Sequence, residues 1–406
     1  MPPYPSVTSG PKLDAFAREL DELQARVRES AGDEDLRHLR KIEAWGRVAA
    51  LLGYATSWIA PNPLSIFAIA FGRFVRWTAV AHPVCHRGYD RCAAVPDSRR
   101  GSVFARGRRR LLDWFDWIHP DAWHEEHNVQ HHYRLNETAD PDLVERNLKW
   151  LRESRMPRWL RLAMVPLFAI SWKFVYYAPS TLEALERAEA RRDRRPEIKT
   201  VEQLLAERWS TSGLGSFIPR MSSRLWLRCF LPYLMVYFVA IPALASPLGW
   251  WAVVSVLINS VLAEFVTNAH AFVTIVPNHA GEDLYSFEGR TRSRGEFYLR
   301  QIVGSTNYRC GGDLNDVMHG WLNYQIEHHL WPDMSLLQYR RAQPEVKAIC
   351  ERHGVPYVQE SVWLRCKKAV AIIVGDASMR RWDDAVAEAE ADAEAAISPT
   401  PRSAVA

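Results

Sequence analysis

Cysteine is scarce in this sequence, and none of it is arranged in pairs. The chain has six cysteines in 406 residues, and no two of them form a C-x-x-C motif. A disulfide framework and a thiolate zinc site are therefore not expected, and the thiols are typical of small packing residues in a reducing compartment. The N-terminal stretch also lacks the apolar core of a secretory signal, so any membrane insertion is expected to begin at an internal segment.

Charged residues are missing from two long stretches, although they make up 24% of the whole chain. Residues 48–72 carry no charge, and neither does the segment between Arg228 and Glu264. Proline interrupts both stretches, in PNP at 61–63 and in ASPLG at 245–249, and a residue without an N–H cannot continue a helix. Since about 20 apolar residues cross a bilayer, each stretch predicts a hairpin of two membrane helices, about 44–60 with 64–82 and about 224–245 with 250–274.

Arginine is concentrated between the two predicted hairpins, in 99–110. Because basic residues tend to stay on the cytoplasmic side, this distribution predicts that the segment between the hairpins and both termini are cytoplasmic. Residues 159–177 are apolar too, but Arg161, Pro166 and Lys173 interrupt them, which favours a helix lying in the membrane interface. The arginines of 99–110 and 187–195 fit this topology, and they could also anchor anionic lipid headgroups or dock a phosphorylated acyl carrier or an acidic electron donor.

These segments predict an all-α integral membrane protein with about four transmembrane helices in two hairpins and a cytoplasmic helical cap. Three regions are expected: a cytoplasmic N-terminal amphipathic helix region at 1–43, a membrane domain at 44–380 and a low-complexity tail at 381–406. The polar helix of 12–43 is expected to lie solvated on the membrane face, and 333–380 to belong to the cap. Nucleic-acid binding is not indicated, because the basic residues lack interleaved aromatics.

Histidine is clustered rather than scattered. The clusters are, in chain order, His82 with His86, then His124, His127, His131 and His132, then His328 with His329. Residues four apart share one face of a helix, so the first pair, and likewise His127 with His131, could each grip one metal ion. The adjacent pairs could straddle a groove and contribute to two sites. His270, His279 and His319 lie shortly before the last cluster.

So many imidazoles exceed the ligand set of a single ion. Neutral imidazole is a common metal ligand that suits zinc, copper, iron and nickel, whereas one zinc site takes four ligands. Three clusters on the predicted cytoplasmic side therefore predict a pair of metal ions, and the membrane setting predicts an apolar substrate that arrives from the bilayer. A non-enzymatic metal transporter is an alternative, but it would place histidines deep within membrane helices.

The clusters and their order resemble the membrane fatty acid desaturase family, in particular its front-end type. The first box of that family, H-x-x-x-H, is matched by His82 and His86, and the second, H-x-x-x-H-H, by His127, His131 and His132. The third, Q-x-x-H-H, is matched within the stretch from Gln325 to Pro332, and the resemblance covers about 44–360. The family also has a further histidine after the last membrane helix, which His279 matches. The metal ligands that this resemblance implies are His82, His86, His127, His131, His132, His279, Gln325, His328 and His329.

The resemblance also implies the chemistry. It indicates two iron ions, O₂ and two external electrons per turnover, with a cis double bond in an acyl chain and water as products. The substrate would be an acyl lipid or an acyl thioester, held among membrane lipids. Because no H-P-G-G haem motif is present, the electrons are expected from a separate donor such as a ferredoxin or a cytochrome b5-like protein. A hydroxylase with the same iron pair is the alternative, and the glutamine of the third box favours the desaturase.

Other polar residues are candidates for supporting roles. His124 and His270 are weaker candidate ligands, His319 is expected to be structural or to support a ligand, and Asn268 to contact a metal through water. Glu264, inside the last apolar stretch, is expected either to line the cavity or support a ligand, or to lie near enough to the interface to stay hydrated. Carboxylates often orient ligating histidines, and those near the boxes are Glu125, Glu126, Glu327, Asp313 and Asp316.

Overall fold

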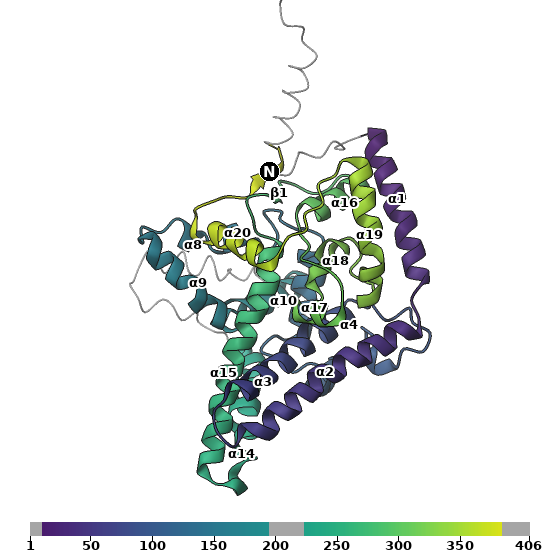
Figure 1. Cartoon of the computed structure of the whole chain (residues 1–406). Helices are drawn as coiled ribbons and strands as arrows, with labels where there is room; N and C mark the ends of the chain where they lie inside the picture. Colours follow the sequence, from purple (N-terminus) through teal and green to yellow (C-terminus); the bar gives the residue numbers. More distant parts are fainter. Residues whose placement is uncertain (1–9, 195–222, 384–406) are drawn as a thin grey trace, which may run out of the picture.

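The computed structural model describes residues 10–194 and 223–383, and these residues are helical almost throughout (Figure 1). The α-helices are α1 (Gly10–Glu29), α2 (Asp33–Ser57), α3 (Pro63–Val75), α4 (His82–Cys85), α5 (Arg110–Asp113), α6 (Pro120–Trp123), α7 (Val144–Asn147), α8 (Lys149–Arg152), α9 (Arg158–Trp172), α10 (Ala178–Arg192), α12 (Ser223–Leu225), α13 (Leu231–Leu234), α14 (Ile241–Ala243), α15 (Trp250–Ile275), α16 (Arg294–Val303), α17 (Asp313–Met318), α18 (Gln325–Leu330), α19 (Leu336–His353) and α20 (Val362–Val374).

Shorter elements complete these helices. Within residues 10–194 and 223–383, five segments are π-helical, namely η1 (Arg76–Ala81), η4 (His124–His131), η5 (Lys173–Tyr177), η7 (Trp226–Phe230) and η8 (Met235–Ala240). The 3₁₀ turns are η2 (Asp97–Arg99), η3 (Gly107–Arg109), η9 (Ser246–Leu248), η10 (Val276–Asn278) and η11 (Leu322–Tyr324). The strands β1 (Tyr285–Ser286) and β2 (Arg380–Arg381) pair in parallel. The fold is therefore that of an all-α protein, as the sequence predicts.

The predicted turn at 61–63 joins α2 and α3 into a hairpin. Asn62 caps α3, because its side-chain oxygen accepts from the backbone N–H of Ser65 at 2.8 Å, and Pro63 occupies the first helical position, where its missing N–H costs nothing. The two helices pack closely at Gly72, where an added Cβ would lie 2.6 Å from the Cβ of Ala50. The second predicted hairpin is present too, since the chain turns between α14 and α15.

Four helices in the described part of the chain are long and apolar enough to cross a membrane: Pro63–Cys85, Arg158–Arg192, Ser223–Leu248 and Trp250–Asn278. Three of them correspond to the predicted spans 64–82, 224–245 and 250–274. The fourth does not correspond to 44–60, because any stretch of α2 long enough to cross includes Lys41, Glu43 and Arg47. Instead it is the helix around 159–177, for which the sequence favoured an interfacial position. Pro166 does not interrupt this helix, and its interfacial placement stays a prediction.

The membrane helices extend to the end of the molecule opposite the cap. In Figure 1, α3, α14 and α15 reach the lower end, whereas α16, α18, α19 and α20 lie at the upper end. Large apolar side chains are exposed around the two hairpin turns, namely Trp58, Ile59, Leu64, Leu244, Leu248, Trp250 and Trp251. Aromatic and aliphatic side chains in this position are typical of the lipid-facing end of a membrane bundle. The architecture is therefore that of an integral membrane protein with a helical cap.

The N-terminal region differs in one respect from its predicted form. The stretch 12–43 is divided at Ser30–Gly32, so that α1 lies along α19 in the cap (Figure 1). One face of α1 is buried there, through Leu13, Phe16 and Leu20 among others, and the helix is not simply solvated on the membrane face. The second helix, α2, runs across the expected boundary at 43. Most of the expected tail at 381–406 lies outside the described residues.

Candidate metal centre

The histidine boxes converge where the membrane helices meet the cap. Two groups of buried histidines are present, and within each group the ligand nitrogens lie within 4.8 Å of one another. The first histidine group is His82, His86, His127 and His328, and the second histidine group is His131, His279 and His329. His132 lies between them, with its Nε2 3.3 Å from that of His127 and its ring stacked 4.5 Å from that of His329. The structure thus brings together all eight histidines that the sequence predicts as ligands.

The second box lies on a π-helical turn, which divides its histidines between the two groups. The N–H of His132 bonds to the carbonyl of His127 at 3.2 Å, a five-residue step that α-helical spacing does not include. His127 belongs to the first histidine group and His131 to the second. The two rings also stack at 5.3 Å, and their ligand nitrogens lie with an Asp142 carboxylate oxygen within 4.8 Å of one another. The expectation that this pair grips one metal ion therefore stays a prediction. A π-turn also precedes the first box directly, at η1.

The third box contributes to both groups from the short helix α18. His328 belongs to the first histidine group and His329 to the second, as the straddling arrangement predicts. The amide of Gln325 lies 2.9 Å from Nε2 of His279. A four-residue step along α18 separates Gln325 from His329, so this amide belongs beside the second histidine group.

Three of the histidines predicted as ligands form hydrogen bonds to buried side chains outside the two groups. Nδ1 of His131 donates to Asp140 at 2.9 Å, and Nδ1 of His329 donates to Oε1 of Gln301 at 3.0 Å. Tyr339 donates its hydroxyl proton to the carbonyl of Pro332, so it accepts from Nδ1 of His328 at 3.2 Å. Each contact fixes the ring and directs Nε2 into the centre. None of these three supporting residues was predicted from the sequence, and only Asp140, which follows the second box closely, could have been suspected from its position.

The carboxylates proposed as supports lie elsewhere. Glu327 accepts from Asn307 and Tyr357, Asp316 accepts from Tyr324, and Asp313 pairs with Lys41. Glu125 accepts from Gln130. Glu126 is fully buried, but its carboxylate makes no contact with a ligand nitrogen in the described part of the chain.

The weaker candidate ligands have other partners too. His124 contacts the amide of Asn128 at 2.9 Å, and His270 donates to the carbonyl of Met318 at 2.6 Å. Nδ1 of His319 contacts the carbonyl of Asn315. The side chain of Asn268 donates to the Glu264 carboxylate and accepts from the N–H of Lys173. None of these four residues belongs to either histidine group within the described chain.

Glu264 is buried among the membrane helices. Its carboxylate pairs with Arg73 at 3.0 Å. It also accepts from the indole of Trp117 at 2.6 Å and the hydroxyl of Tyr233 at 2.5 Å. These contacts join α15 to α3 and to the 223–248 helix, so the expectation of a hydrated position was wrong. The expectation that Glu264 lines the cavity or supports a ligand stays a prediction.

The histidine groups carry nitrogens that fit bound metal ions. Nε2 of His86, His328 and His329 is buried without a hydrogen-bond partner among the described residues, and a buried unpaired polar atom is costly. Nε2 of His82 faces Nε2 of His127 at 3.1 Å, an arrangement in which at most one of the two can donate. A metal ion would satisfy such nitrogens. The donor set suits iron and also zinc or copper.

The protonation of the rings agrees with ligation. Burial, followed by the neighbouring histidines, lowers the pKa of His127, His132, His328 and His329 well below the ordinary value, so these rings are neutral and keep a lone pair. His131 differs, because the effect of burial is outweighed by the Asp140 carboxylate, which raises the pKa of this ring. The same carboxylate makes His131 a stronger electron donor to a metal.

Comparison with known proteins agrees with the boxes. The Fatty acid desaturase family matches residues 56–361. The chain is 24% identical to the NADPH-dependent stearoyl-CoA 9-desaturase of Mycobacterium tuberculosis (strain ATCC 25618 / H37Rv), over 86% of this chain and 76% of the relative. It is 30% identical to the Acyl-lipid (7-3)-desaturase of Rebecca salina, over 60% of this chain and 50% of the relative. It is 28% identical to the Delta(8)-fatty-acid desaturase 2 of Arabidopsis thaliana, over 36% of this chain and 32% of the relative.

The family match covers all three histidine boxes and the membrane helices Pro63–Cys85, Ser223–Leu248 and Trp250–Asn278. The buried histidine groups lie where those helices meet the cap. The chain belongs to the fatty acid desaturase family and is an oxidoreductase that acts on fatty acyl chains.

Proposed function

We propose that this protein is a di-iron, O₂-dependent desaturase that introduces a cis double bond into the acyl chain of a lipid or thioester. The observation that carries the proposal is the pair of buried histidine groups, which share the second and third boxes and have unpaired nitrogens. An enzyme that binds one ion would not need two such groups, and the family match supports acyl chains as the substrate class.

The residues divide naturally between two iron ions. The first histidine group would hold one ion and the second histidine group the other, with His132 between them and Gln325 beside His279. Bound iron, with O₂ and two external electrons, supplies the oxidising power that an alkyl C–H bond demands and that no side chain provides.

The protein's own residues position these ligands and keep water out. Asp140, Gln301 and Tyr339 fix three of the rings. Trp123 is buried and stacks on His127 with centroids 4.6 Å apart, so one side of this ring is covered by an apolar surface. Exclusion of water in this way protects reactive species from side reactions.

The membrane arrangement belongs to the same proposal. Residues 44–380 would form the membrane domain, with both termini and the histidine groups on the cytoplasmic side. The arginines of 99–110 support this orientation. An acyl chain could then enter from the bilayer while its polar end stays at the cytoplasmic surface.

The donor and the substrate form are proposed from chemistry and from the relatives. A separate electron donor, such as a ferredoxin or a cytochrome b5-like protein, would deliver the two electrons. The mycobacterial relative is named for NADPH and stearoyl-CoA, which favours NADPH as the electron source and an acyl thioester as the substrate. The algal relatives are named for acyl-lipid substrates, which keeps a phospholipid acyl chain as the other form.

The test is to express the full chain in a host of known lipid composition and to analyse its fatty acids by mass spectrometry after derivatisation of double bonds. We expect a new cis-unsaturated acid with the wild type and none with His329→Ala. The matched control is His353→Ala, since His353 contacts Glu19 in the cap and should leave the product unchanged. A hydroxy acid in place of the alkene would make the enzyme a hydroxylase, and an unchanged profile with an iron-loaded protein would contradict the proposal.

A further inference from the structure

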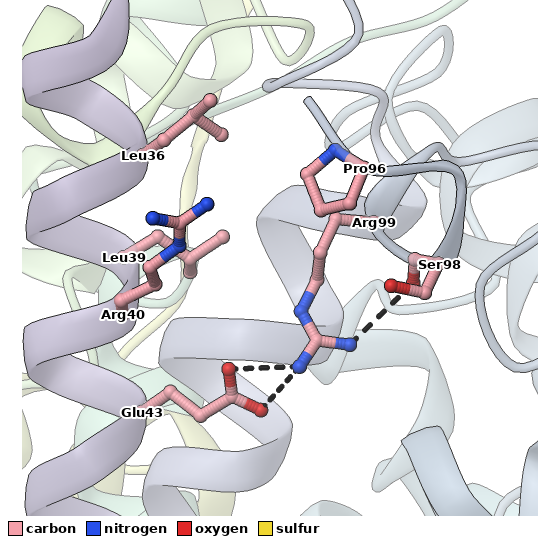
Figure 2. A pocket seen from close by; sticks show the side chains of 7 residues that line it. All are labelled: Leu36, Leu39, Arg40, Glu43, Pro96, Ser98 and Arg99. Carbon is pink, nitrogen blue, oxygen red and sulfur yellow. Dashed lines mark hydrogen bonds and ion pairs between the residues drawn. The ribbon is translucent and has the colours of Figure 1, made fainter. Parts of the chain in front are cut away.

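A cavity of about 130 Å³ lies between α2 and the loop that follows the first histidine box (Figure 2). It is lined by Leu36, Leu39, Arg40, Glu43, Pro96, Ser98 and Arg99. None of these residues belongs to a histidine group, so the cavity is separate from the metal centre. Both walls combine apolar and basic side chains, with Leu36, Leu39 and Arg40 on the helix and Pro96 and Arg99 on the loop.

The arginines at the cavity carry more positive charge than the neighbouring carboxylates can neutralise. The Glu43 carboxylate, whose side chain is only 7% exposed, accepts from Arg99 at 2.6 and 2.8 Å. It also accepts from Arg47 at 2.7 Å and from Arg76. Arg99 lies 3.7 Å from Asp113 as well, which pairs with Arg109. Four guanidinium groups therefore face two carboxylates, and two positive charges remain in excess at this point of the surface.

Arg40 adds a further cation that has no partner. It is exposed and makes no hydrogen bond or ion pair with any described residue. Figure 2 shows its guanidinium beside Leu36 and Leu39 on the helix side of the gap, facing the loop that carries Pro96 and Arg99. A planar guanidinium and a hydroxyl offer several donors to one anion. Phosphate oxygens accept such donors at short range, and Arg is the side chain best suited to bind them in a bidentate manner.

The position of the cavity along α2 identifies the source of the phosphate. Directly after Arg47, α2 turns apolar and exposes Leu51 and Leu52 to 69% and 60%, as expected for a surface in contact with lipid. Glu43 lies about two turns before Leu51, so the cavity is at the depth of the lipid headgroups. We propose that this cavity binds the phosphate of an anionic phospholipid headgroup. The proposal concerns binding alone and does not depend on the desaturation reaction.

The experiment uses the full chain reconstituted into lipid nanodiscs of phosphatidylcholine, with or without phosphatidylglycerol. The readout is the phosphatidylglycerol that stays bound on transfer to detergent, measured by native mass spectrometry. Arg40→Gln removes the unpartnered cation without breaking a contact, and we expect it to weaken retention about tenfold, as the loss of one charge-assisted hydrogen bond would. Arg37→Gln is the matched control, because Arg37 is exposed on the same helix but does not line the cavity. It should behave as the wild type.

A second arm separates the two sources of a phosphate group. Inorganic phosphate is titrated into the lipid-free protein in detergent, and the unfolding temperature is followed. We expect little change for the wild type at concentrations where phosphatidylglycerol stabilises it. Equal stabilisation by inorganic phosphate would overturn the lipid assignment, as would equal retention of phosphatidylglycerol by Arg40→Gln and Arg37→Gln.

Discussion

Replacing Asp140 with asparagine tests how far a residue outside the ligand set controls the metal centre. The carboxylate is fully buried, and it accepts from Nδ1 of His131 at 2.9 Å, the N–H of Asp142 at 2.9 Å and the N–H of Asn136 at 2.8 Å. An asparagine of the same size has one oxygen and one NH₂ group, so at least one of these donors loses its acceptor. His131 also loses the negative charge that increases its electron donation.

The expected magnitude follows from comparable supporting contacts. Loss of such a contact typically lowers metal affinity or activity about 10–100-fold, which corresponds to about 1.4–2.8 kcal/mol. The assay measures iron per chain after dialysis against increasing chelator, together with the yield of desaturated product. Asp140→Asn should release iron at a lower chelator concentration than the wild type, and the product should fall in parallel.

A matched control distinguishes this effect from a general change of charge near the second box. Glu125→Gln removes a carboxylate of the same box that accepts a hydrogen bond from Gln130 and not from a histidine, so iron retention and product should stay at wild-type levels. If Asp140→Asn kept both its iron and its turnover, the contact with His131 would have no part in holding the metal, and the reasoning would be refuted.

Three further predictions concern the loop after α15, the third box and the membrane topology. Asp283→Asn removes the nearest carboxylate of the fully buried Arg365, at 2.7 and 2.8 Å, and leaves it the longer contact with Glu360 at 3.4 Å. The free energy of unfolding should therefore fall by up to about 3–5 kcal/mol in denaturant titrations. Burial raises the pKa of Asp283, but Arg365 outweighs burial and lowers it. The greater stability of the wild type over Asp283→Asn should therefore be present above a pH of about 4 and be lost as the pH falls further. A difference in stability that does not change with pH would contradict the pairing. Gln325→His should keep the metals and part of the activity, whereas Gln325→Leu should lose iron together with turnover, unless position 325 lies outside the site. Labels placed near Asn62 or Ser246 should react only from the side opposite tags at both termini, and labelling from the same side would exclude the two-hairpin topology.

Short-range patterns made the ligands and the hairpins predictable. The boxes depend on spacing that is visible in a single chain, and all eight histidines predicted as ligands lie together in the structure. The turn at Asn62 was visible because Pro63 and the absence of charge act locally. The helix Arg158–Arg192 was harder to assess, because Arg161 and Lys173 dilute its apolar character. Pro166 is accommodated within this helix, as prolines are in many membrane segments.

Contacts between distant segments could not be predicted. Gln301 supports His329 from 28 residues away, and Glu264 pairs with Arg73 from 191 residues away. No local pattern specifies either pair, since each depends on how helices pack in three dimensions. The division of the second box between two groups was also hidden, because α-helical spacing was assumed where the chain makes a π-turn.

The π-turn and the adjacent histidines together explain how one compact centre can serve two ions. The rings of His127 and His131 stack, and their ligand nitrogens lie within 4.8 Å of each other, so the second box joins the two histidine groups. Along η4, His127 lies with the first box while His131 faces His279 and Asp140. The adjacent pair in α18 repeats the division with consecutive residues. Because both shared boxes are short, buried helical segments, the separation of the two groups is fixed by backbone geometry, and the supporting side chains have only to set the rotation of each ring.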